Sequence, residues 1–586
     1  MPLTGQDGAR AREKAYTTRT MLPLGAHVKA LGALALSACL GLFAPAGCGS
    51  SSNGAGKNSG CSGDACGPGD GGSMADAADA AGEASADAGH DAEGGPSAAS
   101  CTFDGKTVAS GASVTAYQAA SVPAGSVCVS QRRACTDGTL GGTYTSASCS
   151  VTLVPAFYVS PTGSDKNAGT LAAPFLTLTK AQSAMQASAS IKTTYVRAGT
   201  YALTASSGAS SCDGGMGTTA IDLGAADAGE TWSYYPPDGF GSAVIDGGST
   251  SAITGVACAF SAGSAPNLTF IGLQFQHLQY SAIWASSSSG LTVSDNTIHD
   301  LTVAVYNVGG VAIHSSSGVT VKNNFIHDVA YVGIGAWGGS MSNTAISGNV
   351  VLSSCTAAAN PGGNDMDGGD CGAIYTWDTT HLSTNLTITN NYVRDVNLSS
   401  SGAGDYTGCC ATGIYLDDGM SNATVSGNVV TGIKSQCFVI HGGNDDTYTD
   451  NLCDLGTSQY QRIMTYQWDS LMLAMTGNTI ENNIIVAGSM APGTGYSDSG
   501  TPTAPTIENN AYYNYVGSAV DSAGSNGSDA NPTYENPGIS CWDPTIASGS
   551  PVFTAPVSFK KLASGWGPPG FVLPQTGTPP SWPHGC

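Results

Sequence analysis

The sequence has little charge, and most of the charge that it has is negative. Charged residues make up 10% of the 586 residues, and 42 Asp and Glu against 19 Lys and Arg give a formal net charge of −23. An acidic chain repels the phosphate backbone of nucleic acids, so we expect no nucleic-acid partner. The apolar run 30–46 is too short for a comfortable membrane span, which argues against a transmembrane anchor there.

Small residues and cysteines are abundant instead. The 80 Gly residues, together with many Ser, Thr and Asn residues and short Val and Ile runs, favour β structure over helices. Eighteen cysteines in a chain of this size indicate an oxidising compartment, in which most of them form disulfides.

Residues 1–48 have the pattern of a secretory signal peptide. The apolar run 30–46 ends at Gly47 and Cys48, and the basic residues that precede it are Arg10, Arg12, Lys14, Arg19 and Lys29. A small residue before Cys resembles a bacterial lipoprotein signal, which implies that Cys48 is lipidated. Met21 is an alternative start of the chain.

Two cysteines compete as the lipidated residue. The segment that ends at Cys39 fits the lipoprotein motif better locally, but its apolar run is shorter. Lipidation of Cys48 leaves sixteen downstream cysteines, an even number that can pair completely, whereas Cys39 leaves seventeen. We therefore expect a lipid on Cys48, a location on the bacterial cell surface as an outer-membrane lipoprotein or secreted protein, and membrane contact only through the anchor.

Two segments separate the signal from the main body of the chain. Residues 49–100 are mostly Gly, Ala, Ser and Asp without periodicity, which predicts a disordered linker. Residues 101–155 contain short β-like runs and four cysteines, Cys101, Cys128, Cys135 and Cys149. They predict a small β module held by two disulfides of undetermined pairing. A zinc site is the alternative, but the CxxC pairs that it needs are absent.

The main body contains a repeated phrase. Apolar and polar residues alternate up to an Asn, and an apolar residue stands two positions after it, as in 291–298, 319–326 and 386–393. Most intervals between successive copies are 23–32 residues; the repeated residues are Asn296, Asn324, Asn349, Asn391, Asn428, Asn483 and Asn510, with a degenerate copy at Asn451. The alternation predicts strands with one buried face, and stacked coils would place the Asn side chains in a ladder at one bend.

This pattern resembles the right-handed parallel β-helix of the pectate-lyase-like superfamily over roughly 156–586. The resemblance implies an all-β solenoid with the disulfide-rich module N-terminal to it. Residues 174–186 should form a short helix over the first coil, because an open solenoid end exposes strand edges. The Pro- and Gly-rich segment 532–586 lacks the repeat and should fold back as a cap, with Cys541 and Cys586 as a candidate staple.

Two similar phrases, 372–378 and 412–418, lie on the third strand of successive coils. Each reads Gly, apolar, Tyr, apolar and then a carboxylate. We align these strands by their inward residues, which are Ile334, Ile374, Ile414, Phe438 and Ile463. Strand alternation then gives outward neighbours about 4.8 Å apart, namely Trp337, Trp377, Asp417, His441 and Tyr466. The column beside it contains Gly335, Tyr375, Tyr415, Val439 and Met464.

This face would surround carboxylates with aromatic side chains. Asp378 and Asp418 follow at the strand ends, and Trp284 and His314 join from earlier coils. Sugar rings pack on aromatic faces, so we expect a polysaccharide or oligosaccharide to bind Trp337, Trp377, Tyr375, Tyr415 and Tyr466. Two carboxylates on adjacent coils suit glycoside hydrolysis, in which one protonates the leaving oxygen and the other attacks or activates water.

The two phrases, followed by His441-Gly-Gly-Asn444, resemble a group of secreted bacterial β-helix proteins. That group includes glycoside hydrolases of the α-L-fucosidase and β-xylosidase kinds. The resemblance places the catalytic carboxylates on Asp378 and on Asp417 or Asp418. Structural alternatives remain open: Asp417-Asp418-Gly419 could be a simple turn, Asp378 could cap a loop, and His441 could only bond the neighbouring coil.

Two insertions, 355–371 and 399–410, flank the phrases. Asp365, Asp367 and Asp370 have part of the spacing of a calcium loop but lack the remaining ligands, so we expect no cofactor and keep calcium as a weak candidate. The cysteine groups should be structural disulfides: 355 with 371, 212 with 258, and the set 409, 410, 437 and 453.

We expect a monomeric, surface-anchored glycoside hydrolase. A polysaccharide lyase is the first alternative, but residues 156–586 contain 30 Asp and Glu against 10 Lys and Arg, a field that repels polyuronates. A non-catalytic glycan-binding protein or adhesin is the second, because a fold alone does not imply catalysis. Convergence of the carboxylates would favour an enzyme.

Overall fold

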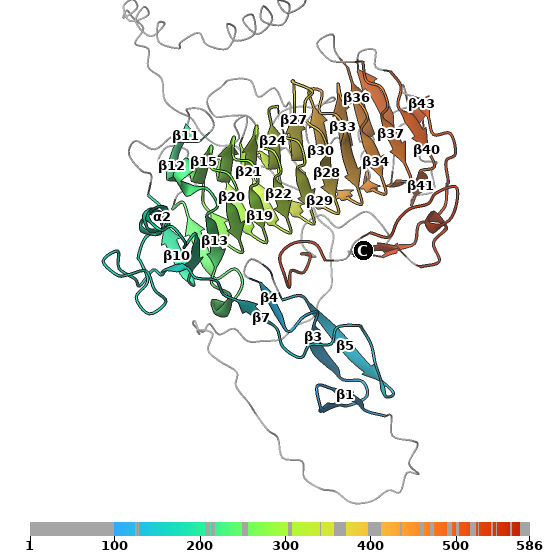
Figure 1. The fold of residues 1–586 in the computed structure, drawn as a ribbon. Coiled ribbons are helices and arrows are strands. Elements are labelled where there is room, and N and C mark those ends of the chain that lie inside the picture. Colours follow the sequence, from blue (N-terminus) through green and yellow to red (C-terminus); the bar gives the residue numbers. More distant parts are fainter. Residues whose placement is uncertain are drawn as a thin grey trace, which may run out of the picture. The chain divides into compact units, whose positions relative to one another are not determined.

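The computed structural model describes residues 99–574, apart from 124–125, 127, 205–210, 213–216, 249–255, 303–307, 340, 357–370, 397–411, 434–435, 457–461, 469–473, 489–494, 500–502, 516–522, 525–526, 541–542, 547 and 563–564. Three long sheets dominate the described residues, and each coil of the chain contributes one strand to each sheet (Figure 1). Strands of successive coils pair in parallel, with antiparallel pairs only at the ends of the third sheet. This is a parallel β-helix, as the sequence predicts.

The strands follow the three-part repeat. The first sheet contains β8 (Phe157–Val159), β9 (Thr193–Val196), β13 (Thr231–Tyr234), β16 (Thr269–Ile271), β19 (Thr292–Ser294), β22 (Thr320–Lys322), β25 (Ala345–Ser347), β28 (Leu386–Thr389), β31 (Ala423–Ser426), β34 (Thr447–Thr449), β37 (Thr479–Glu481) and β40 (Thr506–Glu508). The second contains β10 (Gly199–Ala202), β14 (Ala243–Asp246), β17 (Gln274–Gln276), β20 (Thr297–Leu301), β23 (Phe325–Val329), β26 (Val350–Leu352), β29 (Tyr392–Arg394), β32 (Val429–Thr431), β35 (Leu452–Asp454), β38 (Ile484–Ala487) and β41 (Ala511–Asn514). The third contains β11 (Ser211–Cys212), β12 (Gly217–Leu223), β15 (Cys258–Gly263), β18 (Ser281–Ser286), β21 (Gly309–His314), β24 (Val332–Trp337), β27 (Gly372–Trp377), β30 (Thr412–Asp417), β33 (Gln436–His441), β36 (Arg462–Gln467), β39 (Tyr496–Ser499), β42 (Ala523–Gly524) and β43 (Gly527–Ser528).

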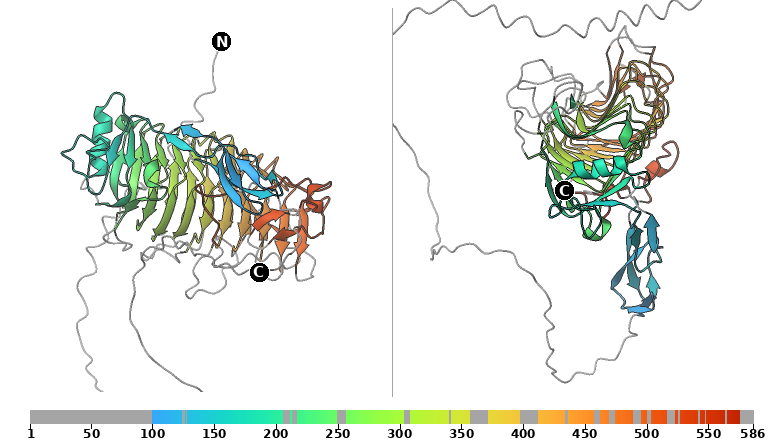
Figure 2. Two further views of the ribbon diagram at one scale, coloured as in Figure 1. Left: turned by 90° about the horizontal axis from the view of Figure 1, so that it is seen from below. Right: turned by 60° about the vertical axis from the view of Figure 1, so that its left-hand side comes forward.

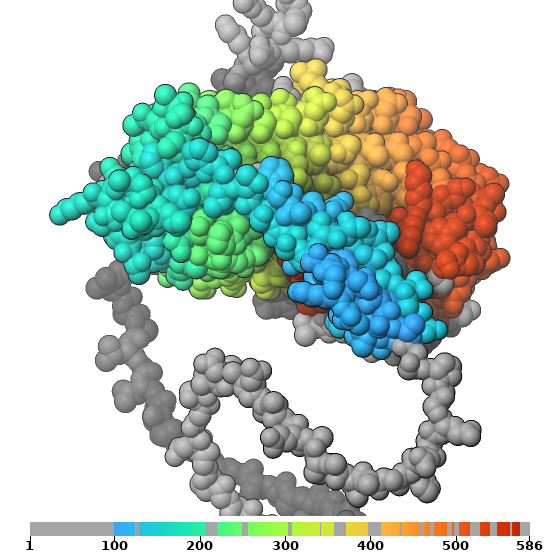
Figure 3. Space-filling view, turned by 60° about the horizontal axis from the view of Figure 1, so that its bottom comes forward, coloured from blue at the N-terminus to red at the C-terminus, as the bar shows by residue number. Residues whose placement is uncertain are grey.

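The turned views show successive strands in parallel rows, and the space-filling view shows the colours changing in order along the coils (Figures 2 and 3). Each coil therefore packs mainly against its two neighbours, as in other solenoids. The inward residues of the three sheets form one continuous apolar core, which includes Phe270, Ile298, Ile326 and Ile374. In the described part of the chain, none of the helices has the length and apolarity that a membrane crossing requires.

The Asn ladder lies between the first and second sheets, where the sequence places it. Asn391 is typical: its Oδ1 accepts from the backbone N and from Nδ2 of Asn349, both at 3.0 Å. Its own Nδ2 donates to Oδ1 of Asn428 at 2.9 Å and to the carbonyl of Ile346 at 3.0 Å. The ladder continues through Asn451, which accepts from Asn428 and donates to Asn483 although its copy of the repeat is degenerate, and it ends at Asp529. Buried amides thus satisfy one another from coil to coil.

The left-handed residue of this bend is the one before the ladder Asn, and not the ladder Asn itself. Its φ is positive in every described coil from Asp295 to Asn509; the residues are Asp295, Asn323, Gly348, Asn390, Gly427, Asp450, Asn482 and Asn509. Only Gly, Asn and Asp occupy this position, because they tolerate the left-handed region best. This explains why the repeated phrase reads Asn-Asn, Gly-Asn or Asp-Asn.

Disulfides join the cysteines that the sequence groups together. Within the solenoid the pairs are Cys212–Cys258, Cys355–Cys371 and Cys437–Cys453. The pairs Cys101–Cys135 and Cys128–Cys149 hold the N-terminal module, which settles the open pairing and excludes the zinc alternative. Cys39, Cys48, Cys409, Cys410, Cys541 and Cys586 lie outside the described residues, as do the signal and linker segments.

The N-terminal module has short strands and a small core. Its strands are β1 (Cys101–Phe103), β2 (Lys106–Val108), β3 (Ser113–Tyr117), β4 (Ser121–Pro123), β5 (Ser130–Thr136), β6 (Thr139–Leu140) and β7 (Ser150–Thr152). Both half-cystines of the first disulfide are buried with Val108, so the disulfides replace much of a core here. The next strand, β8, already belongs to the first sheet of the solenoid.

A helix and the C-terminal segment cover apolar surface of the solenoid. Helix α2 (Leu178–Ala187) begins at Thr177, whose side chain accepts from the backbone N of Lys180, and it packs on the first coils as predicted. The C-terminal segment also folds back, but it covers the outer face of the second sheet. Its apolar residues, including Val552, Phe559 and Trp566, cluster there with Val350, Tyr392 and Val429. The reason is the unusually apolar outer face of these strands.

Candidate functional site

The outward residues of the third sheet form two columns, because each strand pairs in register with the next. The first column is His314, Trp337, Trp377, Asp417 and His441. The second lies two residues earlier along each strand and contains Gly335, Tyr375, Tyr415 and Val439. The predicted register from Trp337 to His441 is therefore confirmed. Trp284 joins the same face, with its ring 5.1 Å from that of His314.

The predicted register beyond His441 is wrong by one residue. Phe438 pairs with Met464 and not with Ile463, and His441 pairs with Gln467. Thr465, and not Met464, therefore continues the second column. Tyr466 faces the interior with 1% of its surface exposed, and its hydroxyl accepts from Nδ2 of Asn478 at 2.7 Å. A one-residue shift sends a strand's side chains to the opposite face, so Tyr466 does not belong to the site.

Asp417 ends β30 and accepts hydrogen bonds from three groups. Its Oδ1 accepts from Nδ1 of His441 at 2.6 Å and from the backbone N of Asp418 at 2.9 Å. Its Oδ2 accepts from the hydroxyl of Tyr375. Because the carboxylate can only accept, Nδ1 of His441 carries a proton and donates it to Asp417, while the other ring nitrogen, Nε2, is buried. The three side chains thus form one ordered and nearly buried unit.

Asp418 is the more accessible of the two consecutive aspartates. It is the first residue after β30 and has a φ of 44°, and this left-handed turn directs its carboxylate to the same side as that of Asp417. Its Oδ2 accepts from the indole Nε1 of Trp377, and its Oδ1 lies 3.3 Å from Nδ1 of His441. The side chain is 28% exposed, against 5% for Asp417. Asp417-Asp418-Gly419 is therefore more than a simple turn, because both carboxylates make side-chain contacts with the neighbouring coils.

Asp378 does not join this group. Its Oδ1 accepts from the backbone N and the hydroxyl of Thr380 at 2.8 and 2.5 Å, and its Oδ2 accepts from the backbone N of Ser383 at 2.9 Å. Burial raises its pKa, but the hydrogen bonds from Ser383 and Thr380 outweigh it, so the pKa lies below the ordinary 3.8. The structure thus supports the loop-capping alternative and not a carboxylate facing Asp417.

The aromatic side chains differ in how much ring surface they present. Trp337 lies flat over Gly335 and stacks on His314 at 5.0 Å, with only 3% of its surface exposed. It supports the sheet face and offers no open platform. Tyr375 and Tyr415 pack edge to face at 5.1 Å and are also nearly buried. Trp377 is half-buried, so it is the predicted ring with the most accessible surface.

The sequence pattern missed His381, which contacts the turn after Asp418. Its Nδ1 donates to the carbonyl of Gly419 at 3.0 Å, and a Cβ on Gly419 would collide with its ring. Asp378 orders the turn that contains His381 through its bonds to Thr380 and Ser383. The signal available in the sequence was the position of His381 three residues after the carboxylate of the first phrase.

Asp417, Asp418 and His441 also form a candidate metal centre. One ligand atom from each lies within 4.8 Å of the others, and no other three His, Cys, Asp or Glu side chains converge in this way among the described residues. The weaker calcium candidates Asp365, Asp367 and Asp370 lie outside the described residues. Carboxylates that converge on an imidazole can hold either a shared proton or a cation.

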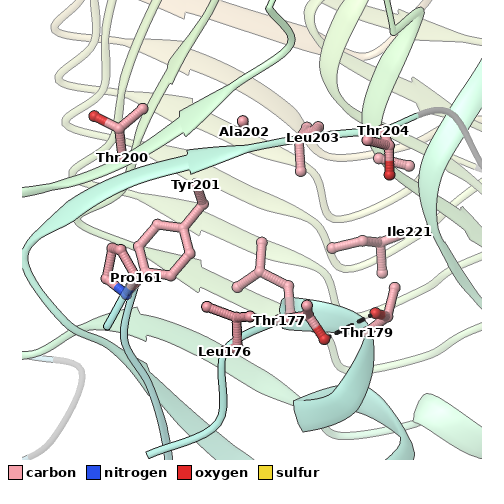
Figure 4. Close-up of a pocket in the computed structure, with 12 residues that line it drawn as sticks. Pro161, Leu176, Thr177, Thr179, Thr200, Tyr201, Ala202, Leu203, Thr204 and Ile221 are labelled. Atoms are coloured by element: carbon pink, nitrogen blue, oxygen red, sulfur yellow. Dashed lines mark hydrogen bonds between the residues drawn. The ribbon is translucent and has the colours of Figure 1, made fainter. Parts of the chain in front are cut away.

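The structure also has a cavity of about 340 Å³ at the N-terminal end (Figure 4). It lies between α2 and strands β10 and β12, and the residues that line it are Pro161, Leu176, Thr177, Leu178, Thr179, Thr200, Tyr201, Ala202, Leu203, Thr204, Ala220 and Ile221. None of these side chains is an acid, a base or a strong nucleophile at neutral pH. The cavity therefore contributes nothing to a catalytic site.

Comparisons with known proteins agree with this architecture. A family model described as the right handed beta helix region matches residues 254–452. The solenoid is thus a right-handed parallel β-helix, as the sequence predicts. No curated protein sequence matches this chain.

Several solved structures have a similar fold at low sequence identity. A lacto-N-biosidase of family GH136 from Eubacterium ramulus is 13% identical, with a TM-score of 0.44 over 65% of this chain and 67% of that chain. XylC in complex with xylose is 11% identical, with a TM-score of 0.40 over 66% and 87%. Pectate lyase Pel9A is 14% identical, with a TM-score of 0.36 over 67% and 81%. Similarities of this size leave the chemistry of the present chain to its own residues.

Proposed function

We propose that this protein is a carbohydrate-active enzyme that hydrolyses glycosidic bonds at Asp417, Asp418 and His441. The observation that carries the proposal is the convergence of two carboxylates on one imidazole, beside the half-buried ring of Trp377. Such a group can transfer protons and stabilise positive charge at a sugar carbon, and the ring supplies a surface for a sugar face.

The residues take different roles in this proposal. Asp418 is the accessible carboxylate and attacks the anomeric carbon or takes a proton from water. His441 acts in its charged form: it gives the Nε2 proton to the leaving oxygen and regains a proton from the attacking water, while Asp417 holds its Nδ1. Because Nε2 is buried in the structure, the ring has to move when substrate binds. Asp417 orients His441 and stabilises its charged form, as a buried carboxylate does in other carboxylate–histidine pairs. Tyr375 fixes Asp417 from the other side.

Charge favours hydrolysis over the lyase alternative. A lyase must neutralise the carboxylate of a uronic acid, which usually requires an Arg, a Lys or a cation. Among the outward residues described in the two columns from β24 to β33, none is Arg or Lys. A neutral glycan avoids this repulsion, so we propose neutral polysaccharides or oligosaccharides as the substrate class.

A screen of neutral and acidic plant and bacterial glycans tests the proposal. Reducing ends and unsaturated ends should be scored separately, because hydrolysis produces only the former. We expect new reducing ends from a neutral glycan, and we expect this activity to disappear in Asp418→Asn. Unsaturated ends would establish a lyase. If the wild type and Asp418→Asn both bind a glycan and the wild type cleaves none, the glycan-binding alternative is established.

We also propose that lipidated Cys48 anchors the protein to the outer surface of the cell. The support is the sequence alone: the basic and apolar pattern of residues 1–48, and the absence of an inner-membrane retention signal at Gly49 and Ser50. The Gly- and Ala-rich linker 49–100 would then hold the solenoid away from the membrane.

A further inference from the structure

A second pair of histidines lies on the outer face of the second sheet. His299 on β20 and His327 on β23 are paired in parallel register. Their rings stack with centroids 4.8 Å apart and planes within 4° of parallel. Both side chains are partly exposed, 15% for His299 and 24% for His327. The sheet therefore holds two imidazoles side by side at its surface.

Each ring is held in the same tautomer by the residue that follows it. Nδ1 of His299 lies 2.7 Å from Oδ2 of Asp300, and Nδ1 of His327 lies 2.7 Å from Oδ2 of Asp328. Because a carboxylate accepts, both Nδ1 atoms carry protons and both lone pairs are on Nε2. The aspartates have positive φ, so this bend gives His-Asp the same geometry in both coils.

A hydrogen bond identifies the atom of His299 that would face a cation. The amide nitrogen of Gln274 lies 2.9 Å from Nε2 of His299, which marks that atom as an acceptor. Phe325, on the same strand, also stacks on the ring of His327, with centroids 4.4 Å apart.

We propose that His299 and His327 form a binding site for a borderline divalent cation such as Zn²⁺. Imidazole nitrogen suits Zn²⁺, Ni²⁺ and Cu²⁺ better than Ca²⁺ or Mg²⁺. A histidine that binds metal usually donates its other N–H to a carboxylate, and Asp300 and Asp328 already supply these second contacts. The carboxylates of the two aspartates add negative charge beside the cation.

The metal geometry requires a small movement. Zn–N bonds of about 2.0–2.1 Å in a tetrahedral site place two nitrogen atoms roughly 3.3 Å apart. The rings of His299 and His327 are stacked 4.8 Å apart, so their Nε2 atoms must move closer together to bind one cation. Each ring can tilt in this way while its Nδ1 stays bonded to Asp300 or Asp328. The cation also replaces the hydrogen bond between Gln274 and His299, and the amide oxygen of Gln274 or water completes the site. A bound cation then crosslinks two adjacent coils.

Titration calorimetry of the full chain with ZnCl₂ and with CaCl₂ tests the site. We expect one zinc per chain, lost at about pH 5 where imidazole takes up a proton. His327→Gln and His299→Gln should each weaken zinc binding at least about tenfold, and Asp328→Asn should weaken it about 10- to 100-fold by releasing the ring. Calcium should not compete. Zinc should also raise the unfolding temperature of the wild type.

His441→Gln is the matched control, since the other candidate centre contains that residue. Zinc binding should be unchanged in this variant, whatever happens to glycan hydrolysis. Loss of zinc binding in His441→Gln with retention in His327→Gln would overturn the proposal and place the metal at the aspartates. No zinc uptake by the wild type at about 1 mM would overturn it as well. Equal unfolding temperatures without metal establish that the variants are folded.

Discussion

Nδ1 of His441 lies 2.6 Å from Oδ1 of Asp417, and this bond joins β33 to β30 across the outer face of the third sheet. The two residues are 24 apart in the chain, but parallel pairing makes them neighbours. The bond places a proton on Nδ1 of His441 and fixes the orientation of the ring, whose Nε2 is buried until the ring moves. The predictions about activity follow from this pair and from Asp418 beside it.

Removing either carboxylate of the site should abolish most activity without unfolding the protein. Asp417→Asn should lower kcat by about 100- to 10,000-fold, because a neutral amide does not stabilise the positively charged form of His441 and holds its ring less well. Asp418→Asn should lower it by a similar factor by removing the accessible carboxylate. Initial rates on the glycan identified by the screen measure both effects.

Asp378→Asn is the control that separates this site from the sequence-based assignment. Its carboxylate bonds Thr380 and Ser383 within a turn, so we expect a loss of about 1–2 kcal/mol of stability and less than a tenfold change in kcat. A larger loss of kcat in Asp378→Asn than in Asp417→Asn would restore the original pairing of catalytic residues.

Hydrolysis should retain the configuration at the anomeric carbon. Oδ1 of Asp418, the proposed nucleophile, lies 3.3 Å from Nδ1 of His441, the proposed proton carrier. This leaves no room for the water that lies between the two groups in inverting enzymes, where they are roughly 6.5–9.5 Å apart, so it favours direct attack by Asp418. Proton NMR of the first product anomer distinguishes the two, and an inverted first product would exclude Asp418 as a nucleophile.

Glu230 should make the folded state less stable as the pH rises. Burial, and then the negative charge of Asp227, raise the pKa of Glu230 from its ordinary 4.5 to about 9. The folded state therefore binds the proton of Glu230 more tightly than the unfolded state does. The resulting contribution to the free energy of unfolding is complete below about pH 4.5 and is lost as the pH rises toward 9. The loss is at most about 1.4 kcal/mol per pH unit in that window.

The substitution Glu230→Gln removes this pH dependence while keeping the size of the side chain. We expect the variant to gain unfolding temperature over the wild type between about pH 5 and pH 8, with the difference increasing along that range. Glu535→Gln, at an exposed position, is the matched control and should show no such trend. A difference that stays constant with pH would show that Glu230 is ionised in the folded protein.

The Asn ladder should contribute strongly to stability at every rung. Asn391→Ala removes the acceptor of two donors on Asn349 and leaves the buried Oδ1 of Asn428 without one of its partners. We expect a loss of about 2–4 kcal/mol in a chemical denaturation experiment. The exposed Asn531→Ala should cost less than about 0.5 kcal/mol, and equal losses would contradict the ladder's role.

Lipid anchoring is tested by cell fractionation. Cys48→Ala should move the protein from the membrane fraction to the soluble fraction, because it removes the residue that carries the proposed lipid. Cys39→Ala should leave the distribution unchanged. The reverse result would assign the lipid to Cys39, and membrane retention of both variants would exclude a lipid anchor at either residue.

The sequence by itself determined the solenoid and most of one functional face. Alternation up to Asn296, Asn324 and later copies specifies a strand, a left-handed residue and a buried amide, all of which are local requirements. Because parallel coils repeat these requirements, the neighbours of Trp377 and Asp417 could be read by alignment. The cysteine groups were predicted from the even number of cysteines, and the structure pairs 212 with 258, 355 with 371, and 437 with 453.

The tertiary structure decided the strand register at β36 and the direction of the side chains that follow the strand ends. Tyr466 turned inward because Phe438 pairs with Met464, a shift that no pattern in β36 specifies. Asp378 and Asp418 occupy equivalent strand ends, yet the left-handed φ of Asp418 directs its carboxylate to His441, while Asp378 turns back to Thr380 and Ser383. Side-chain direction past a strand depends on the turn that follows, and long-range packing selects that turn.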